Sequence, residues 1–223
     1  MFDANCLKLM FVAGSQDFYH IKGGKNDRIS TLLETLELAL ESQITAFQLR
    51  QKGDLALQDP TQIKRLALEC QKLCKKYGTP FIINDEVQLA LELKADGVHV
   101  GQEDMAIGEV IALCKKRQFI GLSVNTLEQA LKARHLDAVA YLGVGPIFPT
   151  PSKKDAKEVV GVELLKKIKD SGVKKPLIAI GGITMHNASK LREYGGIAVI
   201  SAITQAKDKA LAVETLLKIR EGF

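Results

Sequence analysis

Short runs of apolar and β-branched residues recur along the whole chain. Each is followed by a stretch in which apolar positions return every three or four residues. The short runs indicate buried strands, and the longer pattern is typical of amphipathic helices. The sequence predicts eight strands: LKLMFVAG, AFQLRQK, PFIINDE, GVHVGQ, FIGLSV, VAYLGVG, PLIAIGG and IAVISA.

Amphipathic helices are predicted between these runs. In the segment from Ser30 to Ser42, leucines at positions 32, 33, 36 and 40 form one stripe. A further helix is expected from Thr126 to Ala133, where Thr126 and Gln129 have the spacing of a capping box. Strands that alternate with helices predict a parallel sheet. Eight such units without a linker favour an α/β protein with a closed (β/α)8 TIM barrel over an open doubly wound sheet, and we expect one barrel domain over residues 1–223.

Composition and charge narrow the function classes. Of the 223 residues, 46% are apolar and 26% are charged, which is typical of a globular protein rather than a disordered one. The net charge of +5 is spread along the chain in short lysine-rich pieces, so nothing indicates nucleic-acid binding. Apolar runs stay well short of the ~20 residues that span a bilayer, and Asp3 stands where a signal peptide has a basic region. We therefore expect a cytoplasmic protein with no membrane partner.

The four cysteines lack the paired spacing of a secreted disulfide scaffold. Cys70 and Cys74 lie four residues apart on one face of a predicted helix, which is the spacing of half a metal site. No partner pair of His or Cys accompanies them, so we interpret them as small core residues.

Polar residues gather where the predicted strands end, and this is the end at which barrels of this kind carry their active sites. They are Gln48, Arg50, Lys52, Asn84, Asp85, Gln102, Glu103, Asp104, Ser123 and Ser201, together with Gly181 and Gly182. The longest connection, FPTPSKKDA (148–156), follows the sixth strand. Long loops at the catalytic rim usually act as lids or ligand clamps.

The second strand carries a cationic group. Alternate residues of a strand point to the same side, so Gln48, Arg50 and Lys52 are expected to project together. An amide, a guanidinium and an ammonium suit a polyanion. The alternative is that Arg50 and Lys52 only pair with carboxylates of the barrel.

Two carboxylates follow consecutive strands. Neighbouring strands run ~5 Å apart, so their loops can bring Asp85 and Asp104 to one point, an arrangement that a hydrated Mg²⁺ accepts. Such a Mg²⁺ usually takes further ligands from phosphate, so a carboxylate pair opposite Arg50 and Lys52 indicates a magnesium-bound diphosphate. The alternative is that both aspartates are solvated loop residues or helix caps.

A second phosphate site is indicated by AIGGI after the seventh strand and VISA at the end of the eighth. Many barrels bind a phosphate here through backbone N–H groups, and Gly182 permits close approach of the backbone. A glycine pair after a strand is equally typical of a simple turn.

Together these motifs resemble one family. QLRQKG, FIINDEVQLALELKADGVHVGQEDM, IGLSVNTLEQA, YLGVGPIFPTPSKKDA, GVELL, AIGGI and VISAI are similar to the thiamine-phosphate synthases. The resemblance implies a Mg²⁺-dependent transferase of thiamine biosynthesis on a (β/α)8 barrel. It implies the joining of 4-amino-2-methyl-5-hydroxymethylpyrimidine diphosphate to 4-methyl-5-(2-phosphooxyethyl)thiazole or its carboxylated form, with release of diphosphate. A dissociative mechanism is implied as well.

The resemblance also assigns roles to residues. The pyrimidine diphosphate would be held by Gln48, Leu49, Arg50, Gln51, Lys52, Asn84, Ser123 and Lys153. The metal would be held by Asp85 and Asp104. The thiazole phosphate would be held by Thr150, Pro151, Ser152, Gly182, Ile200 and Ser201. Catalysis would depend on Arg50, Lys52, Lys153 and Ser123, and the loop 148–156 would be a clamp between the two substrates, in which Pro149 and Pro151 limit the entropy lost on closure.

Two alternatives stay open beside the synthase. One is a thiazole tautomerase, and Asn125, which stands where many relatives have His, argues against it. The other is a non-catalytic barrel that binds thiamine precursors. His99 lies inside a predicted strand and is interpreted as part of the core or barrel wall. The partners expected are small molecules, and a homo-oligomer is possible.

Overall fold

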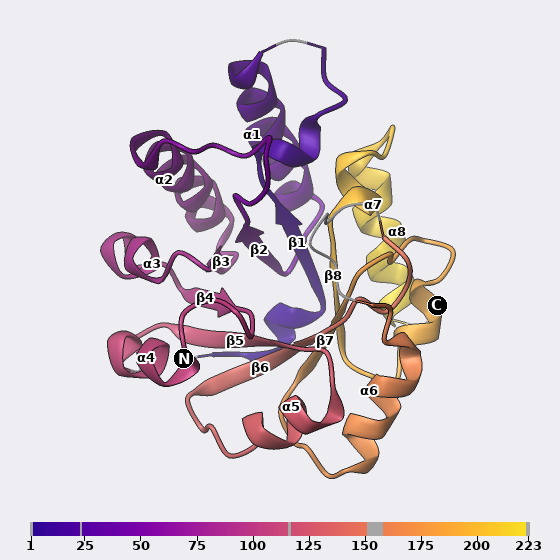
Figure 1. Ribbon diagram of the computed structural model, residues 1–223. Coiled ribbons are helices and arrows are strands. Elements are labelled where there is room, and N and C mark those ends of the chain that lie inside the picture. The colour runs from indigo at the N-terminus through magenta and orange to yellow at the C-terminus, as the bar shows by residue number, and fades with distance from the viewer. Residues whose placement is uncertain (1, 23, 116, 151–157, 222–223) are drawn as a thin grey trace.

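Eight parallel strands close into a barrel in chain order, with β8 hydrogen-bonded to β1 (Figure 1). The structure is a computed structural model that describes residues 2–22, 24–115, 117–150 and 158–221. The strands are β1 (Leu9–Ala13), β2 (Ala46–Leu49), β3 (Phe81–Asn84), β4 (Gly97–Val100), β5 (Phe119–Val124), β6 (Val139–Val144), β7 (Leu177–Ile180) and β8 (Gly196–Val199). The predicted α/β class and (β/α)8 barrel are confirmed.

Helices surround the strands on the outside of the barrel. They are α1 (Lys25–Glu41), α2 (Pro60–Tyr77), α3 (Val87–Leu93), α4 (Ile107–Cys114), α5 (Leu127–Ala133), α6 (Gly161–Asp170), α7 (Ser201–Thr204) and α8 (Lys209–Glu221), with short 3-10 turns η1 (Ala4–Leu7), η2 (Ser15–Phe18) and η3 (Ala188–Leu191). No described helix has the length and apolar character needed to cross a membrane.

The helix ends follow local hydrogen bonding. The helix predicted over 30–42 begins earlier, at Lys25, because a carboxylate oxygen of Asp27 accepts a hydrogen bond from the Gly24 N–H over 2.6 Å. The predicted capping box of α5 is confirmed. The hydroxyl of Thr126 accepts from the N–H of Gln129 over 3.2 Å, and the Gln129 side chain accepts from the N–H of Thr126 over 3.3 Å.

Alternation along the strands divides the core into two layers. Between strands and helices lies the larger layer, in which Phe11, Phe47 and Phe81 stand side by side on β1, β2 and β3. Inside the barrel, Met10 and other side chains of opposite parity form a smaller cluster. Strand residues whose side chains point into the barrel are also the ones that line its mouth.

Cys70 and Cys74 lie in the outer layer, with exposed fractions of 0% and 1%. Burial raises the pKa of the Cys74 thiol to about 12. Both are therefore protonated core residues, as interpreted from the sequence.

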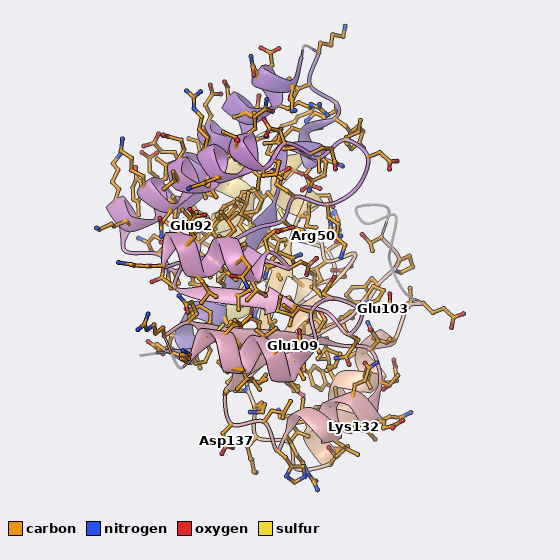
Figure 2. The ribbon with its side chains drawn as sticks, turned by 60° about the vertical axis from the view of Figure 1, so that its left-hand side comes forward. Arg50, Glu92, Glu103, Glu109, Lys132 and Asp137 are labelled. Carbon is orange, nitrogen blue, oxygen red and sulfur yellow. The ribbon has the colours of Figure 1, made fainter. Side chains whose placement is uncertain are left out.

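The two ends of the barrel differ in character. Figure 2 shows Glu103, in the loop after β4, at the right-hand rim, and Asp137, which precedes β6, at the lower left. At the N-terminal end, Phe2 stacks on Tyr141 with ring centroids 6.2 Å apart and contacts Phe119 at 5.1 Å. Aromatic rings therefore fill the barrel interior at this end, beside a hollow lined by Phe2, Phe119 and the loops before β4, β5 and β6.

Candidate active site

A cavity of about 170 Å³ opens at the carboxyl ends of the strands. Its charged and polar lining includes Arg50, Lys52, Asn84, Asp85, Asp104 and Ser123. These residues come from the ends of β2, β3 and β5 and from the loop after β4. The sequence placed these six residues at strand ends, and the fold brings all six to one mouth.

Lys52 joins the two carboxylates. Its Nζ lies 2.8 Å from Oδ2 of Asp85 and 3.2 Å from Oδ1 of Asp104. The side chain of Lys52 is 41% exposed, whereas those of Asp85 and Asp104 are 20% and 22% exposed. Two acidic groups and one ammonium leave the cluster one negative charge in excess when all three are ionised. A cation is thus already accommodated between the aspartates.

The backbone positions both carboxylates. Asp85 has a φ of 64°, a left-handed conformation that Asp tolerates better than most residues, and its N–H donates to the carbonyl of His99 over 2.8 Å. Oδ2 of Asp104 accepts from the N–H of Gly101 over 2.8 Å. That bond leaves Oδ1 directed at Lys52. The aspartate pair is therefore pre-arranged before any ligand binds.

The two aspartates share one proton unequally. Burial raises the pKa of Asp85 to about 6, and the neighbouring carboxylate of Asp104 adds to the increase, although the hydrogen bond from Lys52 opposes it. Burial acts on Asp104 in the same direction, but hydrogen bonds from Asp85, from the Gly101 N–H and from Lys52 together hold its pKa below the usual range. Below about pH 6 the proton therefore resides on Asp85.

Such a donor set suits a hard divalent cation. Asp85 and Asp104 offer carboxylate oxygens from two adjacent loops, and the ammonium of Lys52 already stands where a positive charge is favoured. Within the described part of the chain, no group of three or more His, Cys, Asp or Glu is arranged to hold a metal. The residues present fit an ion that takes only one or two ligands from the protein.

The predicted group on the second strand divides into two. Arg50 is 5% exposed and lines the cavity, but β2 itself ends one residue earlier. Gln48 lies deeper in the barrel, 4% exposed, and its amide donates to the sulfur of Met10 over 3.6 Å. Of the predicted polyanion triad, the structure brings Arg50 and Lys52 into the cavity and places Gln48 beneath it.

The side chains of Leu49 and Gln51 point away from the cavity, because they alternate with those of Arg50 and Lys52, which line it. Leu49 is buried in the outer core layer. The side-chain oxygen of Gln51 accepts hydrogen bonds from the hydroxyl of Ser15 and the N–H of Leu57, each over 3.0 Å. Gln51 thus ties the loop after β2 to η2. Direct substrate contacts by these two side chains stay predictions from the family resemblance.

A second hollow adjoins the first at the ends of β7 and β8. Gly182, Ile200 and Ser201 line it, and Thr150 lines both hollows. Gly182 has a φ of 63°, and a Cβ at this position would lie 2.4 Å from the carbonyl oxygen of Pro149. Glycine is therefore required here for close approach of the loop after β6, and the phosphate site at this turn stays a prediction.

The loop after β6 is attached to β7 as far as it is described. The N–H of Ile147 donates to the carbonyl of Ile180 over 2.9 Å, and that of Phe148 donates to Gly181 over 3.0 Å. These bonds bring Thr150 to the border of the two hollows. The predicted contacts of Pro151, Ser152 and Lys153 lie outside the described residues.

His99 is the site residue that the sequence did not single out. It lies on β4 as expected, but it lines the cavity, and its Nε2 lies 2.8 Å from the hydroxyl oxygen of Ser123. Its Nδ1 lies 2.9 Å from the hydroxyl oxygen of Tyr141. The parity of His99, opposite to that of Val98 and Val100 in the outer core layer, was the available indication.

Fold and cavity together define a class: a (β/α)8 barrel with a charged cavity at its C-terminal mouth. The family described as thiamine monophosphate synthase matches residues 18–203. A thiamine-phosphate synthase of Helicobacter pylori (strain HPAG1) is 90% identical over 217 residues, which cover 97% of this chain and 99% of that protein. The chain belongs to the thiamine monophosphate synthase family.

More distant relatives support this family assignment. A thiamine-phosphate synthase of Pasteurella multocida (strain Pm70) is 52% identical over 213 residues, or 95% of each chain. A solved structure of thiamine phosphate pyrophosphorylase from Pyrococcus furiosus has a TM-score of 0.81 at 36% identity and covers 98% of this chain and 97% of its own. A 3-hexulose-6-phosphate synthase, with a TM-score of 0.63 at 15% identity, shares the fold alone. The chain is an enzyme, a transferase of thiamine biosynthesis with thiamine-phosphate synthase activity.

Proposed function

We propose that this cavity joins 4-amino-2-methyl-5-hydroxymethylpyrimidine diphosphate to 4-methyl-5-(2-phosphooxyethyl)thiazole or its carboxylated form. The products are thiamine phosphate and diphosphate. The observation that carries the proposal is that Arg50 and Lys52 face Asp85 and Asp104 in one cavity, and that this cavity borders a second hollow at Gly182. Two adjoining anion sites suit two substrates that each carry phosphate.

The diphosphate end is formed by the charged cluster. Arg50 and Lys52 bind phosphate oxygens, while Asp85 and Asp104 would hold Mg²⁺. When bound, the metal supplies positive charge that stabilises the leaving diphosphate. Lys52 contacts both aspartates in the free protein, so binding transfers its ammonium from carboxylate to phosphate.

The other substrate occupies the second hollow. Gly182, Ile200 and Ser201 surround its phosphate through backbone groups at the ends of β7 and β8. Thr150 lies between the two substrates and donates its hydroxyl to phosphate. Pro151, Ser152 and Lys153 complete the clamp, with Lys153 reaching the diphosphate.

The bond changes require little proton transfer. The bond between the pyrimidine methylene carbon and the diphosphate oxygen breaks first, and its electron pair leaves with diphosphate. The thiazole nitrogen then gives its lone pair to the resulting pyrimidinylmethyl cation. Arg50, Lys52 and Lys153 neutralise the leaving group, and the cavity walls keep water away from the cation.

The decisive experiment measures both products at once. Purified protein with both substrates and Mg²⁺ should form thiamine phosphate and diphosphate in equal amounts, and omission of the thiazole should abolish thiamine phosphate. Isomerisation of the carboxylated thiazole phosphate without release of diphosphate would support the tautomerase instead. Binding of both precursors without any turnover would support the non-catalytic barrel. A cytoplasmic location and a homo-oligomer stay predictions.

A further inference from the structure

Three side chains form a hydrogen-bonded chain from the barrel interior to the cavity. The hydroxyl of Tyr141 on β6 lies 2.9 Å from Nδ1 of His99 on β4, and Nε2 of His99 lies 2.8 Å from Oγ of Ser123 on β5. Tyr141 is completely buried, His99 is 8% exposed, and Ser123 lines the cavity. The chain thus connects a group without solvent access to a group that faces the ligand.

The barrel makes room for this chain with two glycines. His99 pairs with Gly121 in the register of β4 and β5, and Gly121 pairs with Tyr141 in the register of β5 and β6. A Cβ on Gly121 would lie 2.4 Å from both Nδ1 of His99 and the hydroxyl oxygen of Tyr141. A Cβ on Gly143 would lie 2.9 Å from Cε1 of His99. Two strands that are not neighbours can therefore exchange a hydrogen bond across the intervening one.

The direction of the hydrogen bonds follows from the buried end. Burial, the largest effect, raises the pKa of Tyr141, so its phenol keeps its proton, while a hydrogen bond with the Gln48 side chain acts to lower that pKa. A completely buried phenol O–H needs an acceptor, and Nδ1 of His99 lies 2.9 Å from the Tyr141 oxygen. The phenol proton is then directed at Nδ1 of His99, which accepts it.

The rest of the chain follows from this first bond. A neutral imidazole that accepts at Nδ1 carries its proton on Nε2, and this proton is donated to Oγ of Ser123. Ser123 then has one lone pair occupied, and its own hydroxyl proton is free to point into the cavity.

We propose that His99, held by Tyr141 in the tautomer with its proton on Nε2, is a positioning residue that makes Ser123 a hydrogen-bond donor toward the ligand. Resting on the proposed function, this inference names the complementary group as an acceptor nitrogen of the aminopyrimidine ring. A ring with CH at that position leaves the serine hydroxyl without a partner, which weakens binding. The chain Tyr141, His99 and Ser123 thereby selects the heterocycle, while the charged cluster binds the diphosphate.

The tautomer is measurable in the native protein without any substitution. The sequence has four histidines, so ring ¹⁵N signals of histidine-labelled protein can be assigned with a His99→Gln variant as the reference. At about pH 8.5, two units above the ordinary pKa of imidazole, we expect a protonated Nε2 and an unprotonated Nδ1. Protonation on Nδ1 would overturn the proposed direction, whatever the activity.

The effect on the ligand is tested with Tyr141→Phe, which keeps the buried ring and removes the hydroxyl. We expect its affinity for the pyrimidine diphosphate, measured by calorimetry with Mg²⁺, to fall about fivefold to tenfold, with no change for inorganic diphosphate. Tyr77→Phe is the matched control, because it removes a hydroxyl that bonds Glu37 and Glu41 on the surface. It should change neither affinity.

The outcomes separate the two proposals. Equal pyrimidine diphosphate affinity in native protein and a folded Tyr141→Phe variant would overturn the role of the chain while leaving the synthase function standing. A native protein that binds inorganic diphosphate but not the pyrimidine diphosphate would overturn the proposed function and the proposed ligand of Ser123 together. If Tyr141→Phe and Ser123→Ala each weaken pyrimidine diphosphate binding, a loss in the double variant that is smaller than their sum would show that both act through the same hydrogen-bonded chain.

Discussion

Nζ of Lys52 lies 2.8 Å from Oδ2 of Asp85, and this ammonium occupies the position between carboxylates where the proposed metal would bind. The same ammonium lies 3.2 Å from Asp104, so one side chain neutralises part of the charge of both. Lys52 therefore competes with a cation in the free protein and is released when diphosphate offers it new acceptors. This arrangement makes metal and diphosphate binding mutually supportive.

Replacement of this ammonium should separate binding from catalysis. In Lys52→Ala, Mg²⁺ binding without diphosphate should become several-fold tighter, because the carboxylates lose their competitor and gain net charge. Turnover should fall about 100-fold, because the leaving group loses a cation. Calorimetry measures the first effect and steady-state kinetics the second. Lys64→Ala removes an ammonium that pairs with Glu92 on the surface, 2.5 Å away, and should change neither. Weaker Mg²⁺ binding in Lys52→Ala would contradict the competition.

The carboxylates themselves should be required for metal-dependent activity and not for folding. We expect Asp85→Asn and Asp104→Asn to lose at least about 100-fold in turnover and most of the response to Mg²⁺. Asn tolerates the left-handed backbone of residue 85, so the Asp85→Asn variant should keep its melting temperature within a few degrees. Circular dichroism measures the folding and a Mg²⁺ titration the activity. Full Mg²⁺-dependent activity in both variants would refute the metal assignment.

Metal affinity should depend on pH through Asp85. Its pKa is raised to about 6, so Mg²⁺ affinity should fall as the pH falls through 6. The pH dependence of the folding stability has the opposite sign. An unfolded Asp titrates near about 3.9, so the folded state binds the extra proton between these values. This contribution to stability is complete below about pH 4 and is lost as the pH rises through about 6.

Asp85→Asn cannot titrate and should lack both effects. Calorimetric Mg²⁺ titrations and thermal unfolding between about pH 4.5 and pH 8 measure them, and subtraction of the Asp85→Asn curves isolates the contribution of this carboxyl. A Mg²⁺ affinity that stays constant from pH 5 to pH 8 in the native protein would show that Asp85 is not protonated near pH 6.

Arg50 should distinguish the two substrates. It is 5% exposed at the mouth of the first cavity and does not line the second hollow. Arg50→Ala should therefore raise the KM for the pyrimidine diphosphate at least about tenfold and leave the KM for the thiazole phosphate within about twofold. Arg65→Ala, at an exposed position on α2, is the control for loss of a guanidinium. A change confined to the thiazole phosphate would reverse the assignment of the two sites.

Much of the site was predictable because strand parity is a local property. The apolar runs predicted all eight strands, and their polar ends identified Arg50, Lys52, Asp85 and Asp104 before any contact was known. Local pattern also explains why the second strand was predicted to extend beyond Leu49, where β2 ends. The alternation of AFQLRQK continues past Leu49, but the regular pairing with β1 and β3 ends there, and beyond it the N–H of Arg50 donates to the carbonyl of Ala13 over 3.0 Å.

Other features depend on register, which a single sequence does not reveal. His99 meets Tyr141 only because Gly121 pairs with both, and these residues come from three different strands. A histidine in a strand is commonly part of the core, and nothing near it in sequence indicates a partner 42 residues away. The packing of Gln51 against η2 likewise depends on Ser15, whose position is set by the first loop.

The last prediction concerns the close approach at Gly182. Gly182→Ala should both destabilise the fold and weaken the thiazole phosphate site, because its Cβ would meet the carbonyl oxygens of Pro149 and Phe148 at 2.4 and 2.7 Å. Gly172→Ala is the matched control, since Gly172 also has a positive φ, 79°, but a Cβ there meets nothing within 4 Å. The control should lose only the backbone cost of about 1–2 kcal/mol. Gly182→Ala should lose more and should raise the KM for thiazole phosphate several-fold, with little change for the pyrimidine diphosphate. Thermal unfolding and paired KM measurements test this, and equal behaviour of the two variants would mean that the loop from Pro146 to Thr150 does not depend on contact with β7.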